Sequence, residues 1–231
     1  MKNWIKKEFG DLSKFDISFL TTMLILQIIV FCVAPDSVLG IISGIAGVIS
    51  VVLCARCKIS FYFIGFVQTI SYLVLAWQNK FYGEVIENVF YFVTMIWGIF
   101  VWNKNLQENE DGSQQVSAKS FTPLQWIFSI LGTFAATVVM GYWLNSIGSA
   151  QAYTDAATNV MAIFAQLLMV RRYREQWLWW LLIDLLCLKM WFVAGNWSMV
   201  AMYIAWTINC IYGWVNWSKN ANKANIKEKL T

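Results

Sequence analysis

Long apolar runs alternate with short polar connections along this chain, and each run is long enough to cross a lipid bilayer. A membrane-spanning helix needs about 20 mainly apolar residues. The pattern predicts eight such helices, at 17–34, 38–55, 59–77, 84–102, 122–144, 153–170, 177–194 and 197–217. The segments between several of them are short and carry Pro, Asn, Gly or Ser, which favours tight connections between antiparallel helices.

The basic residues indicate how such a bundle is oriented. If the N-terminus lies inside, every Lys and Arg except Lys80 and Lys189 falls in or next to a segment on the inner side. Cytoplasmic loops of membrane proteins carry this excess of positive charge. The sequence therefore predicts a multi-pass protein of the bacterial inner membrane with both termini in the cytoplasm, and an odd number of spans would destroy the pattern.

Composition excludes several other classes of protein. Apolar residues make up 59% of the chain and charged residues 13%, so lipid has to cover surface that a water-soluble fold could not bury. The basic residues are dispersed, which argues against a nucleic-acid partner. Without His, the chain lacks the usual general base and the commonest metal ligand, and no nucleotide-binding P-loop is present. We expect no cofactor and no metal.

The polar segments divide the predicted fold into parts. Residues 1–37 would form an interfacial N-terminus, helical or frayed, followed by an added first span. Residues 103–121 are polar and predict a mostly structureless inner loop, which leads into a linker span within 105–150. A basic cytoplasmic tail is expected at 220–231.

The two remaining segments, 38–104 and 151–219, are related by an internal repeat. A shift of 115 positions places Arg56 on Arg171, Gly98 on Gly213 and Trp102 on Trp217 without a gap. Both units would start on the outer side, so they are parallel repeats related by an axis along the membrane normal. The sequence predicts a three-one-three arrangement of helices, with the added helix before it, around a central path.

Polar side chains within the spans mark where a solute could bind, although Asn, Gln and Thr also bond helices to one another. In the repeat register Asp184 corresponds to Thr69, and Asn209 to Thr94. Asp184 and Lys189 are five positions apart, too far around a helix to pair directly. Aromatic residues in the same spans could stack on a flat ligand. The polar and aromatic candidates for substrate binding are Gln68, Tyr72, Asn88, Tyr91, Thr94, Asn159, Trp180, Asp184, Trp206 and Asn209.

One stretch is specific enough to indicate a family. Arg171-Arg172-Tyr173-Arg174-Glu175-Gln176-Trp177, followed by Trp180 and Asp184, resembles the basic loop of the PnuC family of bacterial vitamin transporters. Lys58-Ile59-Ser60 and Trp97-Gly98 with Trp102 are similar to weaker family motifs. Together with the topology, the resemblance covers about residues 38–219.

The resemblance implies uptake of nicotinamide riboside by facilitated diffusion and a fold related to the sugar-carrying SWEET proteins. Its ligand-facing positions would be Gln68, Asn88, Tyr91, Trp180 and Asp184, although Asn88 stands where many members have Gln. Thiamine or another vitamin is the nearest alternative substrate. A non-transporting membrane partner protein is a second alternative, and an intramembrane enzyme, disfavoured by the absence of His, is a third. The sequence leaves open whether copies of the chain form a homo-oligomer.

Overall fold

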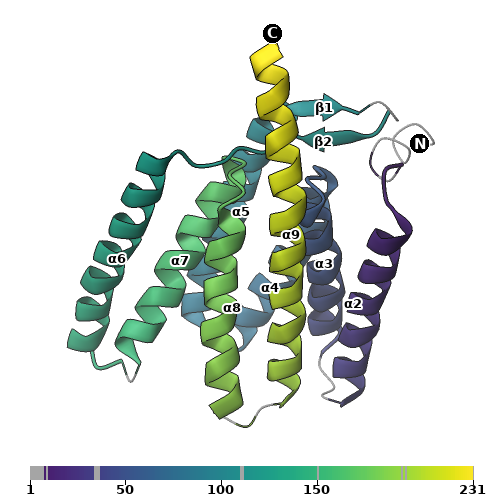
Figure 1. The fold of residues 1–231 in the computed structure, drawn as a ribbon. Helices are drawn as coiled ribbons and strands as arrows, with labels where there is room; N and C mark the ends of the chain where they lie inside the picture. The colour runs from purple at the N-terminus through teal and green to yellow at the C-terminus, as the bar shows by residue number, and fades with distance from the viewer. Residues whose placement is uncertain are drawn as a thin grey trace.

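The computed structural model describes residues 8, 10–33, 37–109, 112–149, 151–193, 195 and 197–230. In the described part of the chain, eight helices of 18 to 34 residues run back and forth between the two ends of one bundle (Figure 1). They are α2 (Lys14–Val33), α3 (Val38–Ala55), α4 (Ser60–Gln78), α5 (Tyr82–Asn103), α6 (Pro123–Ser146), α7 (Ala152–Val170), α8 (Gln176–Val193) and α9 (Trp197–Leu230). The eight helices fall on the eight spans that the hydrophobic pattern predicts. The predicted helical N-terminus lies mostly outside the described residues.

Six of the helices close into a ring. In the order α3, α4, α5, α7, α8, α9, each packs against the next, and α9 packs against α3 to complete the circle. The remaining two stay outside it: α2 packs on α3 and α9, and α6 packs on α7, at opposite edges of the molecule in Figure 1. The ring therefore consists of two triplets, α3–α5 and α7–α9, with α6 linking them along the chain.

Six of the eight helices are long and apolar enough, by length and composition, to cross a membrane, and α7 and α9 are not among them. Polar side chains such as Gln166 and Asn209 lie buried on α7 and α9. Such polar side chains lower the mean hydropathy of both helices, and their burial keeps them away from lipid.

The polar loop between the triplets is more ordered than its composition predicted. We expected a mostly structureless segment at 103–121, but β1 (Leu106–Glu108) and β2 (Gln114–Val116) form an antiparallel hairpin in which Leu106 pairs with Val116. This hairpin caps one end of the bundle (Figure 1), referred to below as the hairpin end. The loop ends at Thr122, whose side chain forms a capping box with Gln125 and starts α6.

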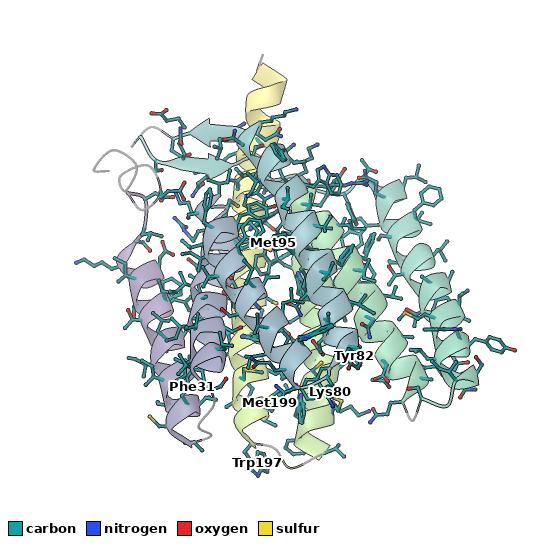
Figure 2. All side chains as sticks on the ribbon, turned by 180° about the vertical axis from the view of Figure 1, so that it is seen from behind. Phe31, Lys80, Tyr82, Met95, Trp197 and Met199 are labelled. Atoms are coloured by element: carbon teal, nitrogen blue, oxygen red, sulfur yellow. The ribbon has the colours of Figure 1, made fainter. Side chains whose placement is uncertain are left out.

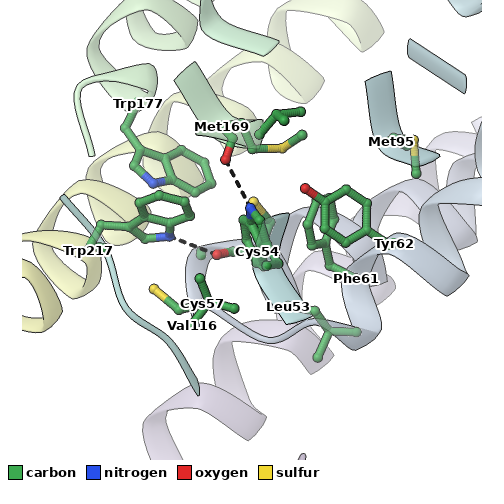
Figure 3. Close-up of a cluster of buried hydrophobic side chains, with 14 of the residues drawn as sticks. Leu53, Cys54, Cys57, Phe61, Tyr62, Met95, Val116, Met169, Trp177 and Trp217 are labelled. Carbon is green, nitrogen blue, oxygen red and sulfur yellow. Dashed lines mark hydrogen bonds between the residues drawn. The ribbon is translucent and has the colours of Figure 1, made fainter. Parts of the chain in front are cut away.

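Equivalent positions of the two triplets make equivalent contacts. The indole Nε1 of Trp102 donates to the carbonyl of Met169 at 3.1 Å, and that of Trp217 donates to the carbonyl of Cys54 at 2.8 Å. Both residue pairs obey the 115-residue shift, so each triplet donates to the other across a local two-fold relation. The two indoles meet edge to face, 5.6 Å apart between centroids, in the buried cluster at the hairpin end. Figure 3 shows this cluster around Trp217 and Cys54.

Candidate functional site

Polar side chains meet inside the ring on both sides of the local two-fold axis. Between α5 and α7, Gln166 Nε2 donates to Thr94 Oγ1 at 3.0 Å, and Thr94 in turn donates to the carbonyl of Phe90 one helical turn earlier. Both side chains are buried. The sequence analysis selected Thr94 but not Gln166, although Gln166 stands seven residues after the selected Asn159 and thus on the same face of α7.

Between α8 and α9, the Sγ of Cys210 donates to Oδ2 of Asp184 at 3.2 Å. Asp184 is only 5% exposed, so a carboxylate lies deep in an apolar bundle with a weak donor beside it. The equivalent pair in the first triplet is Thr69 and Met95, 3.6 Å apart between oxygen and sulfur. The two triplets therefore place polar groups at the same depth, but only the second carries a carboxyl group there.

A second cluster of polar side chains lies on α4 and α5 toward the end opposite the hairpin, where Figure 2 places Lys80 and Tyr82. The hydroxyl of Tyr91 donates to Glu87 Oε1 at 2.5 Å, and Asn88 Nδ2 donates to the carbonyl of Glu84 at 2.8 Å. Tyr72 interacts with the Glu84 carboxylate. The sequence analysis did not select these two glutamates, but the structure joins both to predicted substrate-binding residues.

Three further predicted residues make other contacts. Trp180 is half-buried on α8 and packs against the buried clusters of both triplets. Gln68 is half-buried on α4, and its backbone carbonyl accepts from Ser43. Asn159 donates to the carbonyl of Asp155 within α7. The part of these three residues in binding stays a prediction.

Trp206 and Asn209 lie elsewhere. Both line a small hollow between α2, α3 and α9, together with Gln27 of the added helix. Trp206 is 39% exposed, and the buried Oδ1 of Asn209 has no hydrogen-bond partner among the described residues. Lys189 is exposed in a groove between α8 and α9 and forms no ion pair with Asp184 among the described residues. The structure therefore does not bring Trp206 and Asn209, which were predicted to bind the substrate, together with Asp184.

The basic loop that carried the family resemblance binds the hairpin end together. Arg172 Nη1 donates to the carbonyl of Ser117 at 2.7 Å, and the fully buried Glu175 accepts from the backbone N–H of Phe121 at 3.0 Å. Arg171 lies over the ring of Trp97, and Arg174 over that of Trp214. Burial lowers the pKa of the Arg172 guanidinium. These residues hold helices and loop in place rather than contacting the polar groups described above.

The arrangement is suited to binding a polar, aromatic solute. The described residues contain no group of three His, Cys, Asp or Glu side chains placed to hold a metal ion. The polar groups near the ring interior are carboxyl, amide and hydroxyl groups, flanked by Tyr and Trp rings. Such groups hydrogen-bond a polar solute, attract a cation and stack on an aromatic ring.

Comparison with known proteins gives consistent results. The sequence model of the family described as nicotinamide mononucleotide transporter matches residues 37–219. The nicotinamide riboside transporter PnuC of Haemophilus influenzae is 35% identical over 96% of this chain and 97% of its own length. That of Neisseria mucosa is 34% identical over 94% and 86%. The crystal structure of a vitamin B3 transporter PnuC superposes with a TM-score of 0.81, at 32% identity and over 95% of this chain and 97% of the other.

Proposed function

Because the chain belongs to the nicotinamide mononucleotide transporter family, we propose that it carries nicotinamide riboside across the membrane by facilitated diffusion. The observation that supports this most is the ring of two equivalent triplets with polar side chains buried inside it. Parallel repeats of this kind typically alternate access by moving against each other around a fixed site. Uptake of the riboside would supply a precursor of NAD to the cytoplasm.

The charges favour the riboside over its phosphorylated form. Asp184, Glu84 and Glu87 bring carboxylates to the polar groups on α4, α5 and α8, whereas the described Lys and Arg residues lie at the ends of the bundle or, like Lys189, in an exposed groove. A phosphate group would be repelled by these carboxylates. The nicotinamide ring of the riboside is a flat cation, which the carboxylates attract and the aromatic rings can stack on.

The orientation of the chain in the bacterial inner membrane is part of the proposal. The segments that carry most of the Lys and Arg residues all lie at the hairpin end, namely the 56–58 and 171–174 turns, the flanks of the hairpin at Lys104 and Lys119, and the end of α9. Since positive charge collects on the cytoplasmic side, we place that end, and both termini, in the cytoplasm. The Glu84 and Glu87 carboxylates then lie toward the side from which the cation enters.

Uptake by the pure protein tests this function. Proteoliposomes containing the chain alone should take up labelled nicotinamide riboside without an ion gradient, and unlabelled riboside should compete better than thiamine or nicotinamide mononucleotide. Asp184→Asn should lower uptake at unchanged protein stability, whereas Lys189→Met should leave it unchanged. Uptake of thiamine alone, dependence on an ion gradient, or no uptake at all by folded protein would refute the proposal.

A further inference from the structure

The part of the polar loop at residues 114–119, termed the strap below, lies across the hairpin end and is bonded to both triplets. The backbone N–H of Val116 donates to the carbonyl of Cys57 at 2.9 Å, and that of Lys119 donates to the carbonyl of Arg172 at 2.7 Å. Cys57 and Arg172 are equivalent in the 115-residue register, and both have the left-handed φ that is rare for residues other than Gly, at 56° and 69°. The strap thus joins the same turn of each triplet.

Two buried cations reinforce these attachments. On the first triplet Lys58 Nζ, with no exposed surface, donates to the carbonyl of Gln114 at 2.9 Å and pairs with Asp11 at 2.7 Å. On the second, Arg172 Nη1 donates to the carbonyl of Ser117 at 2.7 Å. A buried charge needs such partners, because leaving it unpaired is costly. The strap carbonyls are therefore part of what keeps both cations stable inside the protein.

The strap also covers the apolar cluster that seals this end. Val116 is fully buried and Ala118 nearly so, and both belong to the same cluster as Trp102 and Trp217. Figure 3 shows Val116 close to Cys57 and Trp217. A third attachment, from the Ala118 N–H to Asn220 Oδ1 at 2.7 Å, ties the strap to the extension of α9. The cluster cannot reach water at this end while the strap stays in place.

The length of the strap limits how far the triplets can separate. Three residues lead from Val116 to Lys119, and an extended chain covers at most about 10 Å in that number. We propose that the strap is the gate at the hairpin end, and that Lys58 and Arg172 are the residues that hold it shut. This inference rests on the proposed alternating access: when the triplets separate here to release solute, the strap leaves at least one of the two turns.

Two native thiols under the strap report on this opening. Cys54 and Cys57 are buried in the cluster, and burial raises the pKa of the Cys57 thiol, so both should react slowly while the gate is closed. The purified protein in lipid nanodiscs would be treated with a membrane-impermeant maleimide. Labelling of the peptide that contains both thiols would be followed by mass spectrometry, without any solute.

Lys58→Met and Arg172→Met should each speed this labelling by on the order of tenfold, because each removes a hydrogen bond from a charged donor. Lys104→Met is the matched control: it removes a positive charge at the same end, and its exposed side chain forms no hydrogen bond or ion pair with the strap among the described residues, so its labelling rate should equal that of the unmodified protein. Equal rates in all three folded variants would overturn the proposal.

A measurement on the unmodified protein covers the case in which a variant does not fold. Conditions that speed thiol labelling should also speed hydrogen exchange of the backbone amides of Val116 and Lys119. Exchange that stays constant while the labelling rate changes would also overturn the proposal that the strap is a gate. Because neither measurement uses a solute, the proposed gate can be confirmed even if the protein does not take up the riboside. Conversely, riboside uptake can succeed while the gate fails.

Discussion

Two glycines should be indispensable to the packing of the ring. A Cβ added at Gly98 would lie 2.5 Å from Cζ of Tyr62, and one added at Gly213 would lie 2.6 Å from Cδ2 of Trp177. Tyr62 and Trp177 are equivalent in the repeat register, and both rings are buried among other aromatic residues. Neither ring can swing away cheaply, so Gly98→Ala should force α4 and α5 apart.

The expected cost can be separated from the change in helix propensity. Overpacking a closed core costs about 1–3 kcal/mol, whereas replacing Gly by Ala inside a helix contributes about 0.5–1 kcal/mol in the opposite direction. Gly132 of α6 is exposed, and a Cβ there would meet no atom within 4 Å. Gly132→Ala therefore shows the propensity effect alone. Gly98→Ala should be less stable than Gly132→Ala by about 1–3 kcal/mol, the overpacking cost.

Thermal unfolding in a single detergent measures this difference. The apparent midpoint of Gly98→Ala should lie below that of the unmodified protein, and that of Gly132→Ala at or above it. Gly213→Ala should fall by a similar amount as Gly98→Ala if the two triplets pack alike. A Gly98→Ala protein as stable as Gly132→Ala would refute the close contact with Tyr62, and with it the packing of the first triplet.

Three further predictions test other contacts. Trp102→Phe and Trp217→Phe should each destabilise the protein, in part through loss of an indole hydrogen bond worth about 0.5–1.5 kcal/mol, and midpoints that differ strongly between them would contradict their equivalence. Glu175→Gln should destabilise the protein by roughly 1–3 kcal/mol, since the carboxylate accepts from both the Phe121 N–H and Arg174. An unchanged unfolding midpoint would show that the charge is dispensable. Cys210→Ser keeps a hydrogen-bond donor beside Asp184 and should retain riboside uptake, whereas Cys210→Ala removes the donor and should reduce uptake. Equal uptake by both variants would show that this hydrogen bond does not matter for transport.

The sequence predicted the helices better than it predicted the site, for a physical reason. The thickness of a bilayer fixes the length of an apolar run, so a run such as 38–55 coincides with α3 (Val38–Ala55). The repeat was also readable in the sequence, because the 115-residue shift that pairs Arg56 with Arg171 still pairs Trp102 with Trp217 without a gap. The strap was not, since its attachments at Val116 and Lys119 use backbone groups that any residue possesses.

Site residues were harder to place because polarity within a span does not reveal direction. Asp184 and Asn209 both looked like midspan polar groups, and both are buried, yet one faces Cys210 and the other lines a hollow beside α2. Which of the two adjoins the ring interior depends on the angular position of each helix in the ring. That position is set by close contacts, such as Gly44 of α3 against Gln27 of α2, which only the packed structure shows.

The symmetry of the ring breaks where the solute is proposed to bind. At the hairpin end the two triplets exchange matched indole hydrogen bonds, whereas deeper in the ring Thr69 and Met95 stand opposite Asp184 and Cys210. Matched contacts let the two halves move against each other as similar bodies. A nicotinamide riboside molecule has no symmetry of its own, with a cationic ring at one end and a sugar at the other. A single carboxylate on one side of the path can therefore orient it, which two equivalent carboxylates could not do.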